Sequence, residues 1–279
     1  MGKELLIETN NLSKSFGERK IINNLNLKVE KGDIYGFLGA NGSGKTTTIR
    51  MILGLIFPSA GQISLNGSNI SKDFKKAITK VGAIVENPSF YTYLSGEENL
   101  KLMANLHSGL EKNRVAEVLE IVKLSERKKD KVKSYSLGMK QRLGIAMALL
   151  NKPTLVILDE PTNGLDPQGM KEIKDTIIQL SREEGITFFI SSHLLHEVEQ
   201  ICSKVGILKN GKLVVQDSIN ELLKSQFEDI DIITPNKEKA MELLNKVDFV
   251  KTVRYSENGI IINLPVSARV KCHRIAQVA

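Results

Sequence analysis

The sequence has no long apolar run. Its apolar stretches, such as Leu155–Leu158, are far too short to cross a bilayer, for which a helix needs about 20 residues. No apolar segment of the signal-peptide kind follows Met1 either. We therefore expect a cytoplasmic protein that reaches the inner face of the cell membrane only peripherally, through a partner.

Cysteine is scarce. The 279 residues contain two, Cys202 and Cys272, and neither belongs to a Cys-x-x-Cys pair or lies near a plausible zinc quartet. This argues against a zinc module, and we expect both thiols to be reduced packing residues. Internal repeats and low-complexity tracts are absent as well.

Acidic residues are outnumbered, with 32 Asp and Glu against 39 Lys and Arg and a net charge of +7. A basic balance suits polyanions such as nucleotide phosphates, nucleic acid or an anionic membrane surface. The densest basic segment, 123–133, is interrupted by Glu126 and Asp130 and contains no aromatic residue. We interpret it as a solvated loop between helices and expect no direct contact with nucleic acid.

Apolar periodicity divides the chain into two parts. Residues 1–225 begin with short strand patterns, become helical at about 95–151, and then alternate strands with helices, as in a mostly parallel sheet covered by helices. Residues 226–279 begin with the pattern strand, helix, strand, strand. We predict an α/β domain with an N-terminal antiparallel β segment and a helical insert, followed by a small α+β appendix. Asn210-Gly211 and Asn258-Gly259 are predicted hairpin turns.

A glycine-rich loop lies between the predicted strand Ile34–Leu38 and a predicted helix. The loop matches the P-loop pattern G-x-x-x-x-G-K-[ST], and its glycines allow backbone N–H groups to surround phosphate oxygens at a helix N-terminus. We expect Lys45 to reach the β- and γ-phosphates of ATP and the Thr46 hydroxyl to bind Mg²⁺. A glycine-rich turn with a chance lysine is the alternative. The expected ATP-binding residues of the loop are Gly39, Asn41, Gly42, Ser43, Gly44, Lys45, Thr46 and Thr47.

Two adjacent carboxylates follow the buried strand pattern Leu155–Leu158. Asp159 and Glu160 emerge at the carboxyl end of that strand, the edge at which open α/β sheets bind ligands. We expect Asp159 to hold the Mg²⁺ shell and Glu160 to polarise the water that attacks the γ-phosphate. Without the glycine-rich loop, two solvated carboxylates at a strand end would explain the pattern equally well.

A third segment, Tyr135-Ser-Leu-Gly-Met-Lys-Gln-Arg142, places small residues at a predicted helix start. This N-terminus is a second candidate for anion binding, although an ordinary helix cap by Ser136 explains the same residues. Taken with the two preceding motifs, this segment makes the chain resemble the ATP-binding subunits of ABC transporters. The resemblance covers nearly the whole span from Leu5 to about Lys224. Ser136 and Gly138 match the family's usual Leu-Ser-Gly-Gly-Gln, whereas the residues after each of them depart from it.

The resemblance implies further site residues. Phe16 matches the aromatic residue that stacks on adenine in this family, and His193 matches the histidine that senses the γ-phosphate. Ser136 and Gly138 would cap the γ-phosphate held by another subunit's glycine-rich loop, and Asp166 would lie in the loop that links the two sites. The family therefore implies a head-to-tail homodimer with two ATP molecules at its seam. Without the resemblance, Phe16 would be assigned to the core and His193 to a structural role.

Glu86 is the most informative departure from the family. Most members have Gln at the end of the strand equivalent to Val81–Val85, where it meets Mg²⁺ and the attacking water. Glu86 together with Phe90-Tyr91 and the 135–142 segment resembles the subgroup that exports peptide antibiotics, in bacitracin-type resistance and lantibiotic self-protection. We expect Glu86 to approach Mg²⁺ and to act in coupling rather than as the main base.

These features predict an ATP-hydrolysing subunit that uses Mg²⁺ and drives export of a peptide antibiotic or a similar amphiphile. A separate transmembrane permease would supply the path, contacted by the helical insert. A soluble ABC-type ATPase acting on ribosomes or DNA is one alternative, but we expect such proteins to carry two ATP domains or long coiled-coil arms. A P-loop module that hardly turns over is another, and Glu160 and His193 argue against it.

Overall fold

The computed structural model describes residues 4–107, 109–225, 227–234, 236–247, 250–256 and 258–265. The chain divides into two compact units, Met1–Gln216 and Asp217–Ala279. Helix α8 (Ile219–Ser225), predicted to end the first domain, belongs to the second unit, where it contacts the first strand of that unit's sheet. Among the described residues, no helix combines the length and apolar character needed to cross a membrane.

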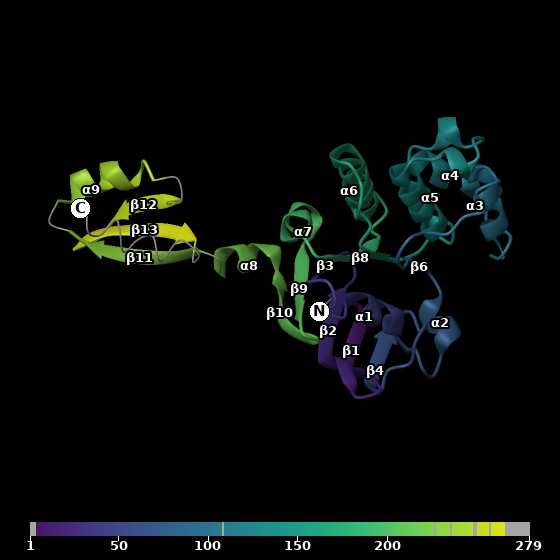
Figure 1. The fold of residues 1–279 in the computed structure, drawn as a ribbon, viewed down its shortest axis with the longest axis horizontal. Coiled ribbons are helices and arrows are strands. Elements are labelled where there is room, and N and C mark those ends of the chain that lie inside the picture. The colour runs from purple at the N-terminus through teal and green to yellow at the C-terminus, as the bar shows by residue number, and fades with distance from the viewer. Residues whose placement is uncertain are drawn as a thin grey trace. The chain divides into compact units, whose positions relative to one another are not determined.

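A six-stranded sheet forms the centre of the first unit (Figure 1). Its strand order is β10-β9-β3-β8-β7-β6, and the five strands from β9 to β6 are parallel. Every residue of β3, β7 and β8 is buried, which explains why each of these strands contains an unbroken apolar run, at 34–38, 155–158 and 188–190. As predicted, Asn210-Gly211 joins β9 to β10, with positive φ at both residues. The strands are β3 (Ile34–Leu38), β6 (Val81–Ile84), β7 (Leu155–Asp159), β8 (Thr187–Ser192), β9 (Lys204–Lys209) and β10 (Lys212–Ser218).

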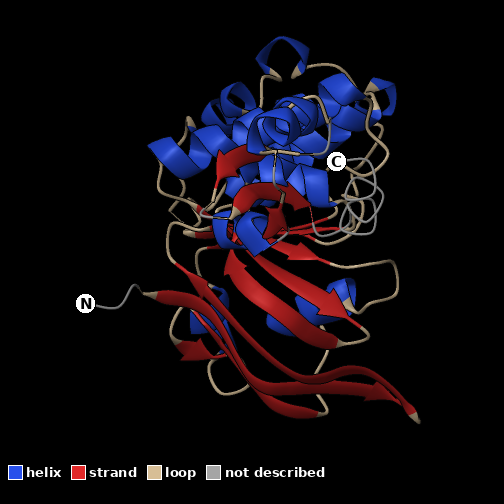
Figure 2. Cartoon of the chain, turned by 90° about the vertical axis from the view of Figure 1, so that its left-hand side faces the viewer, coloured by secondary structure: helices blue, strands red, loops and turns tan. Residues whose placement is uncertain are grey.

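A four-stranded antiparallel sheet of order β2-β1-β4-β5 forms the second layer, on the side of the first unit away from most helices (Figure 2). Strand β1 is longer than the short strand patterns expected at the start of the chain, because a bulge between Thr9 and Leu12 carries it past a polar stretch without ending the pairing. Helix α1 (Lys45–Ile52) contributes to an apolar core shared with both sheets. The strands are β1 (Leu5–Phe16), β2 (Arg19–Glu30), β4 (Ala60–Leu65) and β5 (Ser68–Asn69).

The predicted helical insert consists of three helices that lie together (Figure 1). Its first helix begins with a capping box, in which Ser95 Oγ accepts the Glu98 N–H and Glu98 Oε2 accepts the Ser95 N–H. Two short 3₁₀ turns, Ser125–Arg127 and Val132–Ser134, begin within the basic 123–133 segment. The helices of the insert are α3 (Gly96–Ala104), α4 (Arg114–Ile121) and α5 (Leu137–Leu149), and besides α1 the first unit also contains α2 (Phe74–Ile78), α6 (Pro167–Glu183) and α7 (Leu195–Ile201).

The second unit has the predicted strand, helix, strand, strand order, preceded by α8. Its antiparallel sheet, of order β11-β13-β12, packs one apolar face against α9. Gly259 was predicted in the hairpin turn, but it pairs with Ile233 and is the first residue of β13. Cys272 lies outside the described residues. The elements are β11 (Phe227–Ile233), α9 (Lys237–Leu244), β12 (Thr252–Tyr255) and β13 (Gly259–Pro265).

Candidate functional site

The glycine-rich loop joins the buried strand β3 to helix α1. Gly42 and Gly44 have φ of 78° and 113°, a region that favours glycine. A side chain at Gly44 would also meet Ile22 Cδ1 at 2.4 Å. Because Gly44 is the N-cap residue, no side chain caps the first turn of α1, and its N–H groups are available to an anion.

Lys45, the first residue of α1, is 6% exposed. Its Nζ donates to the Gly39 carbonyl at 2.7 Å and to the Ala40 carbonyl at 3.4 Å, and lies 3.1 Å from Glu160 Oε1. The ammonium group is thus folded back over its own loop and directed toward the end of β7.

Asp159 and Glu160 are held by one residue of the neighbouring strand, Ser191. The Ser191 hydroxyl donates to Asp159 Oδ1 at 2.5 Å and accepts the Glu160 N–H at 2.9 Å. Glu160 has a φ of 50°, which is uncommon for a residue with a side chain and typical of strained functional positions. Ser191 therefore fixes both the buried carboxylate of Asp159 and the backbone turn that presents Glu160.

Glu160 connects two of the other predicted site residues. Its Oε2 lies 2.8 Å from His193 Nδ1, while its Oε1 contacts Lys45. These three residues follow β7, β8 and β3, which are neighbours in the order β3-β8-β7, so their carboxyl ends meet at one edge of the sheet. The side chains of Glu160 and His193 are 21% and 32% exposed, so solvent reaches the contact between them.

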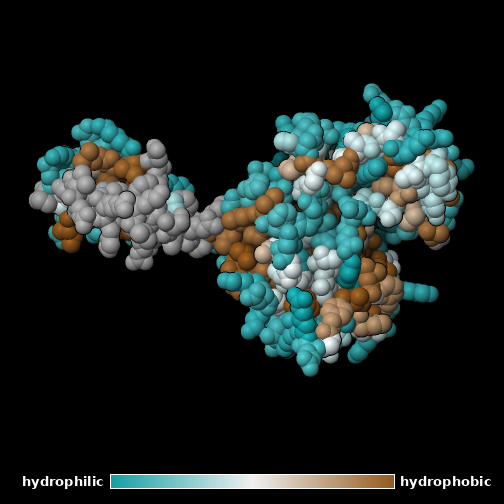
Figure 3. Space-filling view, viewed as in Figure 1, coloured by the Kyte–Doolittle hydropathy of each residue, from teal (hydrophilic) through white to brown (hydrophobic). Residues whose placement is uncertain are grey.

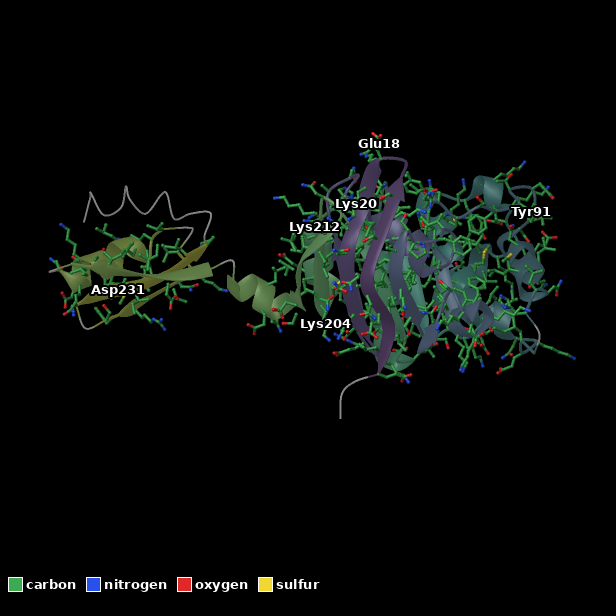
Figure 4. The ribbon with its side chains drawn as sticks, turned by 90° about the horizontal axis from the view of Figure 1, so that it is seen from below. Glu18, Lys20, Tyr91, Lys204, Lys212 and Asp231 are labelled. Atoms are coloured by element: carbon green, nitrogen blue, oxygen red, sulfur yellow. The ribbon has the colours of Figure 1, made fainter. Side chains whose placement is uncertain are left out.

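An open cavity of about 470 Å³ borders these residues, within the usual range of small-molecule sites. Phe16, the last residue of β1, lines it and is 53% exposed, and its ring centroid lies 4.8 Å from Lys14 Nζ. Glu18 marks the adjacent turn between β1 and β2 in Figure 4. An exposed ring at the rim offers a stacking face to a planar group. The lining residues are Phe16, Arg19, Ile21, Asn41, Gly42, Gly44, Lys45, Thr46, Thr47, Glu160, Asn163 and His193.

A neighbouring cavity of about 320 Å³ brings the three predicted metal-binding residues to one space. Thr46, Asp159 and Glu86 all line it, with Asn87, Glu160 and Asn163. Glu86 directs Oε1 to Arg50 Nη2, 2.6 Å away, and its side chain is 61% exposed. Within the described part of the chain, no cluster of three His, Cys, Asp or Glu residues could hold a metal. A hard cation here would therefore depend on a few protein oxygens together with those of a ligand and water.

Ser136, Gly138 and Asp166 line a third cavity, of about 360 Å³, that contains no residue of the glycine-rich loop. Ser136 Oγ caps α5 by accepting the Met139 N–H at 3.2 Å, and Asp166 caps α6 by accepting the Gly169 N–H at 2.9 Å. The ordinary cap considered for Ser136 is thus present. Within one chain, these residues do not join the site around Lys45.

Several residues of the site were missed in the sequence analysis. Ser191 and Asn163 are polar residues at or just after the carboxyl ends of buried strands. The same position in the pattern identified His193 and Glu160, so it could have identified these two residues as well. Arg19 follows the turn after Phe16, so the assignment of Phe16 indicated this region of the chain but not Arg19 itself. Arg50 lies on the last turn of α1, and no pattern indicated that it would meet Glu86.

Comparisons with known proteins agree with this geometry. The ABC transporter family model matches residues 22–163, about half of the chain, a range that includes the glycine-rich loop and Glu160. The bacitracin transport ATP-binding protein BcrA of Bacillus licheniformis is 47% identical over 256 residues, 92% of this chain and 84% of that protein. The lantibiotic transport ATP-binding protein SrtF of Streptococcus pyogenes is 39% identical over 227 residues, 79% of this chain and 97% of that protein.

Solved structures show the same fold. A bacterial ABC transporter cassette, described as dimeric, has a TM-score of 0.69 and 25% identity, over 76% of this chain and 98% of that one. The resemblance inferred from the three sequence motifs is therefore confirmed, as is the P-loop α/β fold. The chain belongs to the ABC transporter family, in which it is an ATP-binding subunit.

Proposed function

We propose that this subunit hydrolyses ATP and so drives export of a peptide antibiotic, or a similar amphiphile, through a separate permease. The observation that carries the ATPase proposal is the position of Glu160, whose two carboxylate oxygens contact Lys45 and His193 beside a phosphate-binding loop. A partly exposed carboxylate held in this way is suited to accept a proton from an attacking water. The substrate class is supported by the names of BcrA and SrtF, which refer to bacitracin and lantibiotic transport.

ATP would lie along the 470 Å³ cavity, with adenine on Phe16 and the triphosphate in the glycine-rich loop. The backbone N–H groups of the loop and the first turn of α1 would bind phosphate oxygens. Lys45 contacts Glu160 at 3.1 Å, so a γ-phosphate near the ammonium group would compete with that carboxylate. Glu160 would then be left to water and to His193, the arrangement that a general base needs.

Mg²⁺ fits the neighbouring oxygen-rich cavity. The Thr46 hydroxyl and the Asp159 carboxylate would hold it, with Asp159 oriented by the Ser191 hydroxyl. When bound, Mg²⁺ neutralises charge on the β- and γ-phosphates. Glu86 lines the same cavity, but its contact with Arg50 supports a coupling role rather than that of the main base.

Two copies of the chain would complete each other's sites. Ser136 and Gly138 lie at the N-terminus of α5, in a cavity without any loop residue. A Cβ built on Gly138 would meet no atom closer than 3.9 Å, so a phosphate could approach the backbone there. In a head-to-tail homodimer, these residues and Asp166 would face the ATP of the partner. The dimeric cassette among the solved structures supports this assembly.

Exposed apolar side chains favour a partner surface near the Arg50–Glu86 pair. Leu55 and Phe57, 62% and 77% exposed, follow the helix that carries Arg50. Figure 3 shows apolar surface over α1 and α2, below the helical insert. Large exposed apolar groups mark protein interaction sites, and we assign this surface and the insert to the permease. The subunit would thereby be held peripherally at the inner face of the membrane.

The segment that leads into the insert contributes aromatic groups to the same proposed surface. Tyr91 and Tyr93 follow Glu86, are 56% and 65% exposed, and meet edge to face with ring centroids 5.9 Å apart. Figure 4 shows Tyr91 at the end of the first unit that the insert forms. The alternative function, on ribosomes or DNA, is not favoured, because the relatives are named as transport proteins.

Two substitutions test the ATPase proposal. Lys45→Ala removes the ammonium group at the phosphates and should abolish ATP hydrolysis. Glu160→Gln should retain ATP affinity and slow hydrolysis by about 10²- to 10⁴-fold, the usual contribution of a general base. Glu184→Gln, at the exposed C-terminus of α6, is the matched control and should hydrolyse ATP at the parent rate. Hydrolysis by Lys45→Ala at the parent rate would show that the loop is wrongly assigned.

Sedimentation tests the dimer, and cell survival tests the substrate class. Glu160→Gln should form a dimer with ATP and not with ADP, because unhydrolysed ATP stays at the seam. A purely monomeric Glu160→Gln protein with ATP would count against the shared site. Cells that express the chain with its permease should survive a peptide antibiotic that kills cells expressing Lys45→Ala.

A further inference from the structure

A buried carboxylate lies behind the proposed catalytic residues. Glu197, on α7, is 5% exposed. Its Oε2 accepts hydrogen bonds from Thr162 Oγ1 at 2.9 Å and from Ser192 Oγ at 3.0 Å. Both donors are also buried, at 7% and 3% exposed. Two buried hydroxyl groups, from two different segments, therefore donate to one oxygen atom of a buried carboxylate on a third.

The two donors belong to the two segments that carry the reacting groups. Thr162 lies two residues after Glu160, in the turn that follows β7, and Ser192 directly precedes His193 at the end of β8. Ser192 Oγ also accepts the Leu194 N–H at 3.0 Å, so it holds the backbone on the far side of the histidine.

The hydrogen bonds to Glu197 lie behind the contact between His193 and Glu160 and link the same two segments. His193 Nδ1 lies 2.8 Å from Glu160 Oε2. Behind them, Ser192, the neighbour of His193, and Thr162, two residues after Glu160, both donate to Glu197. The front contact is partly open to solvent, whereas the rear contacts are buried. In water-exposed surroundings a single His–Glu contact fixes geometry weakly, while buried hydrogen bonds to a carboxylate are strong and directional.

Packing alone does not account for a carboxylate at this position. The small space around Glu197 is lined largely by aliphatic groups, including Ile177, Val198 and Ile201. An apolar side chain would fill that space equally well. Burying a carboxylate removes its hydration and is unfavourable unless hydrogen bonds replace it. Here the hydrogen bonds that replace hydration come from the two segments that carry Glu160 and His193.

We propose that Glu197 is a positioning residue, which fixes Glu160 and His193 relative to each other by tying the turn after β7 to the end of β8. The inference rests on the proposed ATP hydrolysis. Glu197 does not touch the nucleotide cavity, whose lining residues do not include it, so its effect is on geometry rather than on ATP binding. A misplacement of reacting groups by about 1 Å can lower a rate about 100-fold.

The test compares Glu197→Met and Glu197→Gln with Glu199→Gln, a control on the same helix. Met fills the space but cannot replace the carboxylate, and we expect kcat to fall about 10- to 100-fold with KM for ATP within about threefold. Gln keeps an acceptor oxygen and should stay within about threefold of the parent. Thr162→Val and Ser192→Ala should each lower kcat without adding to the loss in Glu197→Met, whereas Thr176→Val, a buried control on α6, should not lower it.

A nucleotide-free measurement separates positioning from stability. The ¹⁵N shifts of the His193 ring, assigned with a His193→Gln sample, should change in Glu197→Met and not in Glu199→Gln, with urea unfolding run in parallel. If Glu197→Met does not fold, Thr162→Val and Ser192→Ala give the same readouts. Parental kcat and unchanged His193 shifts in folded variants would overturn the inference. Equal rates in the parent and Lys45→Ala would instead show that the proposed ATPase activity is wrong.

Discussion

Replacing Glu86 and Glu160 separately by Gln distinguishes a coupling carboxylate from the catalytic base. Both residues line the cavity proposed for Mg²⁺, so proximity alone does not assign their roles. Their contacts differ. Glu160 lies between Lys45 and His193, whereas Glu86 pairs with Arg50 at 2.6 Å. We therefore expect the two substitutions to have effects of very different size.

The magnitude for Glu86 follows from its exposure. Arg50 and Glu86 have side chains that are 41% and 61% exposed, and ion pairs in such surroundings contribute about 0–1 kcal/mol. Gln retains an acceptor and gains a donor, so basal hydrolysis should remain within about tenfold of the parent, or about 1.4 kcal/mol in barrier. Loss of a general base at Glu160 should cost about 10²- to 10⁴-fold, equivalent to about 2.7–5.5 kcal/mol. Arg50→Gln should match Glu86→Gln, because it removes the same pair.

The assay measures phosphate release by the purified variants at saturating ATP and Mg²⁺, with Glu184→Gln as the control. A second readout is survival of cells challenged with a peptide antibiotic while the permease is co-expressed, where Glu86→Gln should protect less well than the parent. A lower ATPase rate in Glu86→Gln than in Glu160→Gln would reverse the assigned roles. If both variants protect cells as well as the parent does, the export proposal is wrong.

Three further predictions concern single side chains. Phe16→Ala should weaken binding of a fluorescent ATP analogue by about 1–2 kcal/mol through the lost stacking face, while Phe16→Tyr should bind within about twofold. Arg114, 4% exposed, donates to two carbonyls at the end of α5. Arg114→Leu should therefore lower the free energy of unfolding in urea by about 2–4 kcal/mol, and Arg114→Lys by less. Burial raises the pKa of the Cys202 thiol to about 12, so in a Cys272→Ser background alkylation at about pH 8 should require denaturant, and rapid labelling of the folded protein would refute this.

The sequence by itself determined the features that are local in the chain. A phosphate-binding loop needs its glycines, Lys45 and Thr46 at fixed spacing, and a buried parallel strand reads as an unbroken apolar run whatever its neighbours are. The loop, the Asp159-Glu160 pair and the capping box at Ser95 were therefore predictable from contiguous residues. Polar stretches within long strands were not, because a β-bulge lets the pairing of β1 continue where its apolar alternation stops.

Only the tertiary structure decided which of these local features meet. The contacts of Glu160 with Lys45 and His193 arise because β3, β8 and β7 are neighbours in the sheet, although they are far apart in the chain. Periodicity specifies that a strand is buried, but not which strand lies beside it. For the same reason, no pattern in the sequence indicates that Arg50 reaches Glu86 or that Glu197 ties two loops together. Those contacts depend on strand order and helix packing, which arise from burial summed over the whole core rather than from any single segment.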